Sequence, residues 1–83
     1  MTVSEVKKAI IEVIVTSTET EIQVTEKTHL LKDMGLSSIE VVILLGDLEN
    51  AFGIRIPVSK VRNVRTAGDL CQVVISILPE QSK

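Results

Sequence analysis

The chain has 83 residues, a hydrophobic fraction of 45% and a formal net charge of −2, so we expect one domain over residues 1–83 with a compact core. Phe52 is the only aromatic residue, so the chain lacks side chains on which bases could stack. The slightly acidic net charge also argues against nucleic-acid binding. The single cysteine excludes an intrachain disulfide and fits a reducing cytoplasm. No aliphatic run is long enough for a membrane span, and no signal-peptide core is present, so we expect neither membrane insertion nor secretion.

The first third of the chain is predicted to form a helix and then a long loop. Val and Ile alone would favour strands, but apolar residues recur at steps of three and four over residues 3–16, which predicts an amphipathic helix. Its inward face is Val3, Val6, Ile10, Val13 and Ile14. Residues 17–36 are interpreted as an ordered loop, and loops of this length are usually functional. Its apolar residues are expected to dock on the core: Ile22, Val24, Leu30, Leu31 and Leu36.

The remainder predicts three more helices. The first of them runs from about Ser38 to Phe52 and is followed by a glycine typical of a helix end. Pro57 can begin a short helix near residues 57–62. The inward face of the Ser38–Phe52 helix is Val41, Leu44, Leu45, Leu48 and Phe52.

The last helix is expected to start at Thr66, with Asp69 as a capping-box-like partner, and to stop at Pro79, leaving 80–83 as a frayed tail. Its inward face is Leu70, Val73, Val74, Ile77 and Leu78. The sequence therefore predicts an all-α fold: a small four-helix bundle with three longer helices, a short third helix, and a long loop between the first two.

Residues suited to catalysis or metal binding are scarce. His29 is the only histidine and no other ligand type clusters with it, so a structural or solvated histidine is favoured. Cys71 lies at the edge of an apolar helix face, which favours a buried, inert thiol. We therefore expect no metal site and no enzyme.

Two adjacent serines, Ser37 and Ser38, lie at the start of the second helix. Ser37 and Glu40 have the S-x-x-E spacing of a capping box, so Ser37 is assigned as the helix cap. Ser38 is not needed as a cap, and its hydroxyl can face solvent. A phosphate attached there would be favoured by the unpaired N–H groups and positive dipole end of the helix.

The segment DMGLSSIEVVILLGDLENAFGIRIP, residues 33–57, resembles the signature of acyl carrier proteins. Length, helix order and the long first loop extend the resemblance over nearly the whole chain. It implies a carrier whose 4′-phosphopantetheine, donated by coenzyme A through a phosphopantetheinyl transferase, is attached to Ser38. The arm would hold an acyl group as a thioester for acyl-loading, synthase or transferase enzymes of fatty acid, polyketide or related biosynthesis. Such a carrier would be a cytoplasmic monomer.

Departures from the family pattern point to a specialised member. Fatty-acid carriers usually have Asp, Glu and Met where this chain has Ser37, Ile43 and Gly46. An aminoacyl or peptidyl carrier is therefore an alternative, as is an unmodified small helical interaction module.

An apolar stripe on the second helix suggests a docking patch beside Ser38, with carboxylates at its rim. The patch and rim comprise Asp33, Ile39, Glu40, Val42, Ile43, Gly46, Asp47 and Glu49. The alternative is that the long loop buries this stripe. Four cations follow between Arg55 and Arg65, a basic segment that could govern partner choice. We also hypothesise that space between the helices, near Gly46, Ala51 and Ala67, admits part of an acyl chain.

Overall fold

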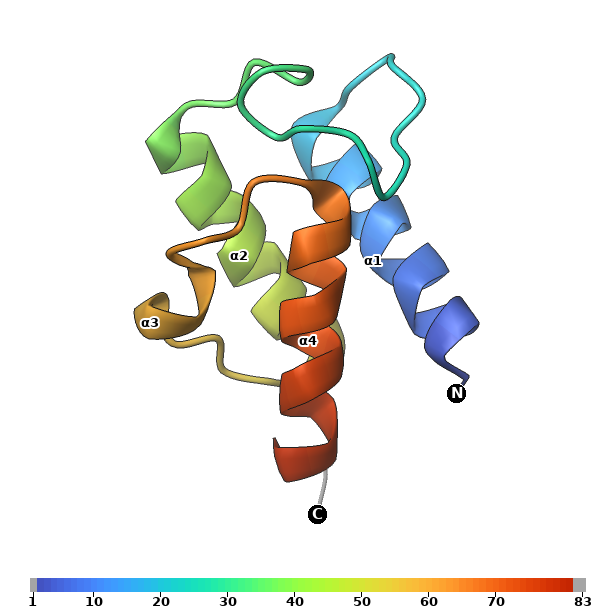
Figure 1. Cartoon of the computed structure of the whole chain (residues 1–83), viewed down its shortest axis with the longest axis vertical. Coiled ribbons are helices and arrows are strands. Elements are labelled where there is room, and N and C mark those ends of the chain that lie inside the picture. The colour runs from blue at the N-terminus through green and yellow to red at the C-terminus, as the bar shows by residue number, and fades with distance from the viewer. Residues whose placement is uncertain (1, 82–83) are drawn as a thin grey trace.

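The fold is described from a computed structural model, which covers residues 2–81 and the side chains of residues 2–78. Four helices occur in this range: α1 (Val3–Thr18), α2 (Ser38–Phe52), α3 (Val58–Val61) and α4 (Ala67–Gln81). Helix α1 packs against both α2 and α4, and α3 packs against α4. The long connection from α1 to α2 passes over one end of the bundle (Figure 1). The predicted all-α, four-helix fold is confirmed.

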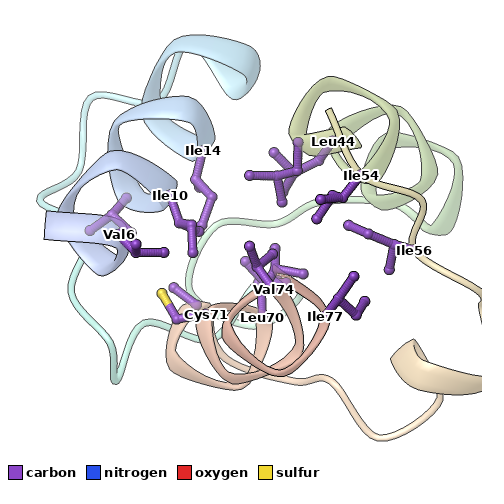
Figure 2. Packing of buried hydrophobic residues seen from close by; sticks show 14 of the residues in the cluster. Val6, Ile10, Ile14, Leu44, Ile54, Ile56, Leu70, Cys71, Val74 and Ile77 are labelled. Carbon is purple, nitrogen blue, oxygen red and sulfur yellow. The ribbon is translucent and has the colours of Figure 1, made fainter. Parts of the chain in front are cut away.

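The core lies between the three longer helices and the connection from α2 to α3. Side chains from α1, α2 and α4 point toward one another there, and Ile54 and Ile56 close the space from the connection (Figure 2). Burial of these aliphatic side chains stabilises the fold by roughly 25 cal/mol per Å². The buried set is Val6, Ile10, Ile14, Val24, Leu30, Leu36, Leu44, Leu48, Ile54, Ile56, Ala67, Leu70, Cys71, Val74 and Ile77.

Several predicted core positions are wrong. Val3 is 57% exposed because it lies in the first turn of α1, beyond the packed part of the bundle. In the long loop, Val24, Leu30 and Leu36 are buried as expected, but Ile22 and Leu31 are 43% and 52% exposed. A loop lacks a fixed period, so neighbouring apolar residues need not face the same way.

Capping residues fix where the three longer helices begin. Thr2 and Glu5 form a reciprocal capping box at α1, which the sequence analysis missed. Thr66 and Asp69 form the same pair at α4: the Asp69 N–H donates to Thr66 Oγ1 at 3.1 Å, and Asp69 Oδ2 accepts from the Thr66 N–H at 3.1 Å. The N–H groups of Arg65 and Thr66 both donate to Asp69 Oδ2, and these two bonds hold the pKa of Asp69 below its ordinary value.

The helix ends differ in part from those predicted. Helix α1 continues two residues past the predicted end, and the Thr18 hydroxyl donates to the Ile14 carbonyl at 2.7 Å. Pro57 is the N-cap of α3 rather than its first residue. The prediction that Pro79 ends α4 is wrong, since the helix continues to Gln81; near a helix end a proline removes only one backbone donor. The expected frayed tail therefore does not begin at Glu80, and Ser82 and Lys83 lie outside the described residues.

Backbone pairing anchors the long loop to the start of α4. The Leu30 N–H donates to the Arg65 carbonyl at 2.9 Å, and the Ala67 N–H donates to the Thr28 carbonyl at 2.9 Å. The Gly68 N–H donates to the Glu26 carbonyl at 2.8 Å, and an isolated antiparallel bridge joins His29 and Thr66. These bonds bring the middle of the loop beside the segment that follows α3.

Candidate functional site

The approach to α2 is shaped by a tight turn over residues 29–36. Asp33 Oδ2 accepts from the His29 N–H at 2.7 Å, and the His29 carbonyl accepts from the Asp33 N–H at 2.9 Å. Gly35 follows with a φ of 68°, a left-handed conformation that costs glycine little. The turn delivers the chain to Ser37 in an extended conformation.

Ser37 caps α2. Its Oγ accepts from the Glu40 N–H at 3.2 Å, and Glu40 Oε1 accepts from the Ser37 N–H at 3.0 Å. Both bonds of the capping box are present, so the Ser37 hydroxyl is occupied by the helix start.

Ser38 is the first residue of α2 and is exposed. Its hydroxyl makes no hydrogen bond with any residue that the structure describes. It also lines a pocket of about 170 Å³, together with Leu30, Leu31, Val41, Val64 and Arg65. Ser38 thus presents an unengaged hydroxyl beside a largely apolar recess.

The apolar stripe of α2 is open to solvent. Ile39 is 73% exposed, Val42 65% and Ile43 56%. A Cβ added at Gly46 would meet no atom within 4 Å. The alternative that the long loop buries this stripe is therefore wrong, because the loop packs toward α4 instead.

The carboxylates expected to rim the stripe are engaged within the chain. Asp33 and Glu40 accept the backbone bonds described above, and Asp47 accepts from the Ser17 hydroxyl of α1. Glu49 Oε2 accepts from the Ile56 N–H at 2.7 Å and so fastens the connection after α2. Each of these side chains has a structural role, whatever else it does.

The basic segment lies after α2 and carries its cations on the surface. Arg55, Lys60, Arg62 and Arg65 are all exposed. The side chains of Lys60, Arg62 and Arg65 form no ion pair or hydrogen bond with the described residues. Val58, in the same segment, is 76% exposed. The surface beside α2 therefore offers three cations that are not held in ion pairs or hydrogen bonds by any part of the chain that the structure describes.

The lone histidine and cysteine both have structural surroundings. His29 Nδ1 accepts from the Lys32 N–H at 3.1 Å within the turn. Cys71 lies fully inside the core rather than at its edge, and burial raises the pKa of its thiol to about 11. Among the described residues, no three His, Cys, Asp or Glu side chains gather as a metal site. No helix in the described range has the length and apolar character to cross a membrane.

The three small residues considered for an acyl cavity do not lie together. Ala67 is fully buried, whereas Ala51 lines an open groove of about 670 Å³ between α1 and α2, with Phe52 and Asp47. Gly46 is half-buried, beside the exposed residues of the α2 stripe. The recess next to Ser38 is formed by other residues, contributed by the loop, by α2 and by the segment after α3.

Comparison with known proteins identifies relatives over most of the chain. The phosphopantetheine attachment site family matches residues 8–74. An acyl carrier protein of Chloroherpeton thalassium is 37% identical over 71 residues, which cover 81% of this chain and 89% of that protein. One of Thermotoga maritima is 33% identical over 54 residues, or 65% of this chain and 67% of that protein. A solved structure of a candidate acyl carrier protein from Mycobacterium tuberculosis superposes with a TM-score of 0.79 at 28% identity, over 86% of this chain and 96% of the other.

Proposed function

The chain belongs to the phosphopantetheine-attachment family of acyl carrier proteins, which are carriers rather than enzymes and bear a 4′-phosphopantetheine group, and we propose that Ser38 is the residue that bears it here. The observation that carries this assignment is the contrast between two adjacent serines. The Ser37 hydroxyl is held in the capping box, whereas the Ser38 hydroxyl is exposed and unengaged.

The surroundings of Ser38 fit such a group. The first N–H groups of a 15-residue helix lie beside it, where a negatively charged phosphodiester is stabilised. The turn before α2 and the capping box hold the backbone at this point, so the attachment site is presented in a fixed orientation. When bound, the group supplies a terminal thiol that carries cargo as a thioester. The buried Cys71 cannot replace that thiol.

Attachment requires one substitution at phosphorus. The Ser38 oxygen forms a bond to the phosphorus that carries the pantetheine moiety of coenzyme A, the pyrophosphate bond breaks, and the adenosine-bearing phosphate leaves. The hydroxyl proton passes to a base of the phosphopantetheinyl transferase. The carrier contributes an accessible nucleophile and a recognition surface, which agrees with the scarcity of acid–base residues around Ser38.

The cargo is proposed to be an acyl group used by enzymes of fatty acid, polyketide or related biosynthesis. Ile43 and Gly46 replace the Glu and Met usual in fatty-acid carriers, which supports a specialised pathway. In this role the protein is a cytoplasmic monomer with a single domain over residues 1–83. Its tether raises the concentration of cargo at a docked enzyme.

Partner enzymes are proposed to dock on the exposed stripe of Ile39, Val42, Ile43 and Gly46. Nearby carboxylates, including Asp33, Glu40 and Asp47, would interact with a partner only through lone pairs left free by their internal bonds. The uncommitted cations of the basic segment are therefore expected to contribute to encounter rates and partner choice.

Intact-mass spectrometry tests the attachment site. The apo protein is incubated with coenzyme A and a phosphopantetheinyl transferase, and we expect the mass of one phosphopantetheine to be added. Ser38→Ala should abolish the addition and Ser37→Ala should retain it. Addition that persists in Ser38→Ala but is lost in Ser37→Ala would overturn the assignment. No addition to the wild-type protein would favour the unmodified interaction module.

A further inference from the structure

The recess beside Ser38 combines apolar walls with one cation. Leu30 and Leu31 come from the long loop, Val41 from α2, and Val64 and Arg65 from the segment before α4. Its volume of about 170 Å³ exceeds the roughly 30 Å³ that one water occupies in the liquid. It is therefore large enough for a short chemical group but too small for a long chain.

The backbone of Arg65 is fixed on both sides. Its carbonyl accepts from the Leu30 N–H at 2.9 Å, and its own N–H donates to Asp69 Oδ2 at 3.0 Å. These bonds belong to the pairing between the long loop and the start of α4, so they place the Arg65 side chain at the recess independently of what that side chain contacts.

The guanidinium of Arg65 remains available. It is exposed and forms no hydrogen bond or ion pair with any described side chain. The nearest acidic group along the chain, Asp69, uses Oδ2 to accept two backbone N–H bonds at the helix start, and it attracts the Arg65 charge without forming a salt bridge with it. Next to the proposed attachment site, Ser37 is neutral where the family usually has Asp, which removes a charge that would repel a phosphate.

We propose that Arg65 and the apolar recess hold the attached end of the prosthetic group against the protein. The Arg65 guanidinium pairs with the phosphodiester on Ser38, since its planar set of donors suits phosphate oxygens. Leu30, Leu31, Val41 and Val64 then contact the branched aliphatic part of the arm. This inference rests on attachment at Ser38. It means that residues of this chain determine where the arm lies when no partner enzyme is docked.

Arg62 provides a matched control for Arg65. Both are exposed arginines of the same segment and lack a partner among the described side chains, but Arg62 does not line the recess. Arg62→Gln and Arg65→Gln therefore remove the same charge from the same surface. The backbone bonds that anchor position 65 do not depend on its side chain, so Arg65→Gln should fold; backbone amide spectra verify this.

The experiment compares the apo and loaded forms of each protein by NMR, after mass spectrometry has confirmed loading. In the wild-type protein and Arg62→Gln, we expect loading to shift the methyl signals of Leu30, Leu31, Val41 and Val64. In Arg65→Gln, these shifts should fall by at least about half, and the ³¹P signal of the phosphodiester should move from its wild-type position. Arg65→Lys should give an intermediate result, because a single ammonium keeps the charge but not the planar donor set.

The outcomes distinguish failure of the Arg65 inference from failure of the proposed carrier function. Loaded wild-type protein with unchanged recess methyls, or equal effects of Arg62→Gln and Arg65→Gln, would overturn the inference and leave the carrier function standing. If coenzyme A and the transferase add no mass at Ser38, both fail together. An Arg65-dependent ³¹P shift that weakens as ionic strength rises would support the ion pair.

Discussion

The N–H of Gly68 donates to the carbonyl of Glu26 at 2.8 Å, and a Cβ at position 68 would lie 2.7 Å from that same oxygen. The first turn of α4 therefore approaches the loop backbone so closely that only glycine fits. Glycine is required at position 68 by this close approach and not by an unusual backbone dihedral angle. The same pairing holds the loop beside Arg65 and thus forms one wall of the recess next to Ser38.

Gly68→Ala should destabilise the fold. The obstructing atom is a backbone oxygen, so the loop or α4 must shift, and we expect a loss of about 1–3 kcal/mol in the free energy of unfolding, typical of overpacking. Gly46→Ala is the matched control, because a Cβ there meets no atom within 4 Å. Alanine inside a helix should gain about 0.5–1 kcal/mol over glycine. Urea unfolding checks both; equal effects of the two substitutions would contradict the close approach.

Substitutions of the two serines at the start of α2 should affect stability unequally, because only one of the two hydroxyls caps the helix. Ser37→Ala removes the acceptor for the Glu40 N–H and should cost about 0.5–2 kcal/mol of unfolding free energy. Ser38→Ala removes an unengaged hydroxyl and should change stability by less than about 0.5 kcal/mol. Denaturant melts of the two apo variants provide the measurement. The opposite order would show that Ser38, not Ser37, acts as the cap.

Local signals in the sequence were sufficient to predict the bounds and the buried face of α2. The bounds of α2 follow from Ser37 at its start and Gly53 at its end, where φ is 62°. Neighbouring capping residues and a left-handed glycine act over a few positions, so they can be recognised without tertiary information. The exposed and buried faces of α2 follow from helical periodicity, with Leu44 and Leu48 inside and Val42 outside.

The recess beside Ser38 could not be predicted in the same way. It depends on the backbone hydrogen bond between Leu30 and Arg65, which are far apart in the chain and carry no periodic pattern. The opposite exposures of Leu30 and Leu31, 2% and 52%, arise from the same pairing. Sequence reasoning identified the basic segment but had no signal that would place Arg65 next to Ser38.

Cys71 should not react with thiol reagents in the folded protein. Its side chain is fully buried and its pKa is raised to about 11, so very little thiolate is present near pH 8. Native apo protein treated with iodoacetamide should gain no label, and loaded protein should gain one, on the arm. Denatured apo protein should gain one label at Cys71. Labelling of native apo protein would show that the core opens at α4 or that the thiol is accessible.

Acid should weaken the fold through its capping carboxylates. Backbone N–H bonds from Arg65 and Thr66 hold the pKa of Asp69 below its ordinary value of 3.8, and the bonds to Thr2 lower that of Glu5 in the same way. A carboxyl with a lower pKa in the folded state stabilises the protein above its unfolded pKa, and this contribution is lost as pH falls through the folded pKa.

We therefore expect the free energy of unfolding to decrease below about pH 4. Asp69→Asn should reduce the slope of that decrease, and Glu5→Gln should reduce it independently, because the two carboxylates cap different helices. Melts at a series of pH values provide the test. An unchanged acid slope in both variants would mean that other carboxylates dominate acid unfolding.

A polar substitution on the exposed stripe of α2 should slow attachment of the phosphopantetheine group more than it changes the stability of the fold. Val42 is 65% exposed, so Val42→Ser leaves the core intact and should change unfolding free energy by less than about 0.5 kcal/mol. If a transferase buries this side chain on docking, its loss removes about 1 kcal/mol of apolar contact, or about a fivefold decrease in kcat/KM for loading. Val3→Ser is the control, since Val3 is similarly exposed at 57% but lies in the first turn of α1. Equal loading rates for both variants would place the transferase contact away from the stripe, whereas a selective loss in Val42→Ser would assign the stripe to docking beside Ser38.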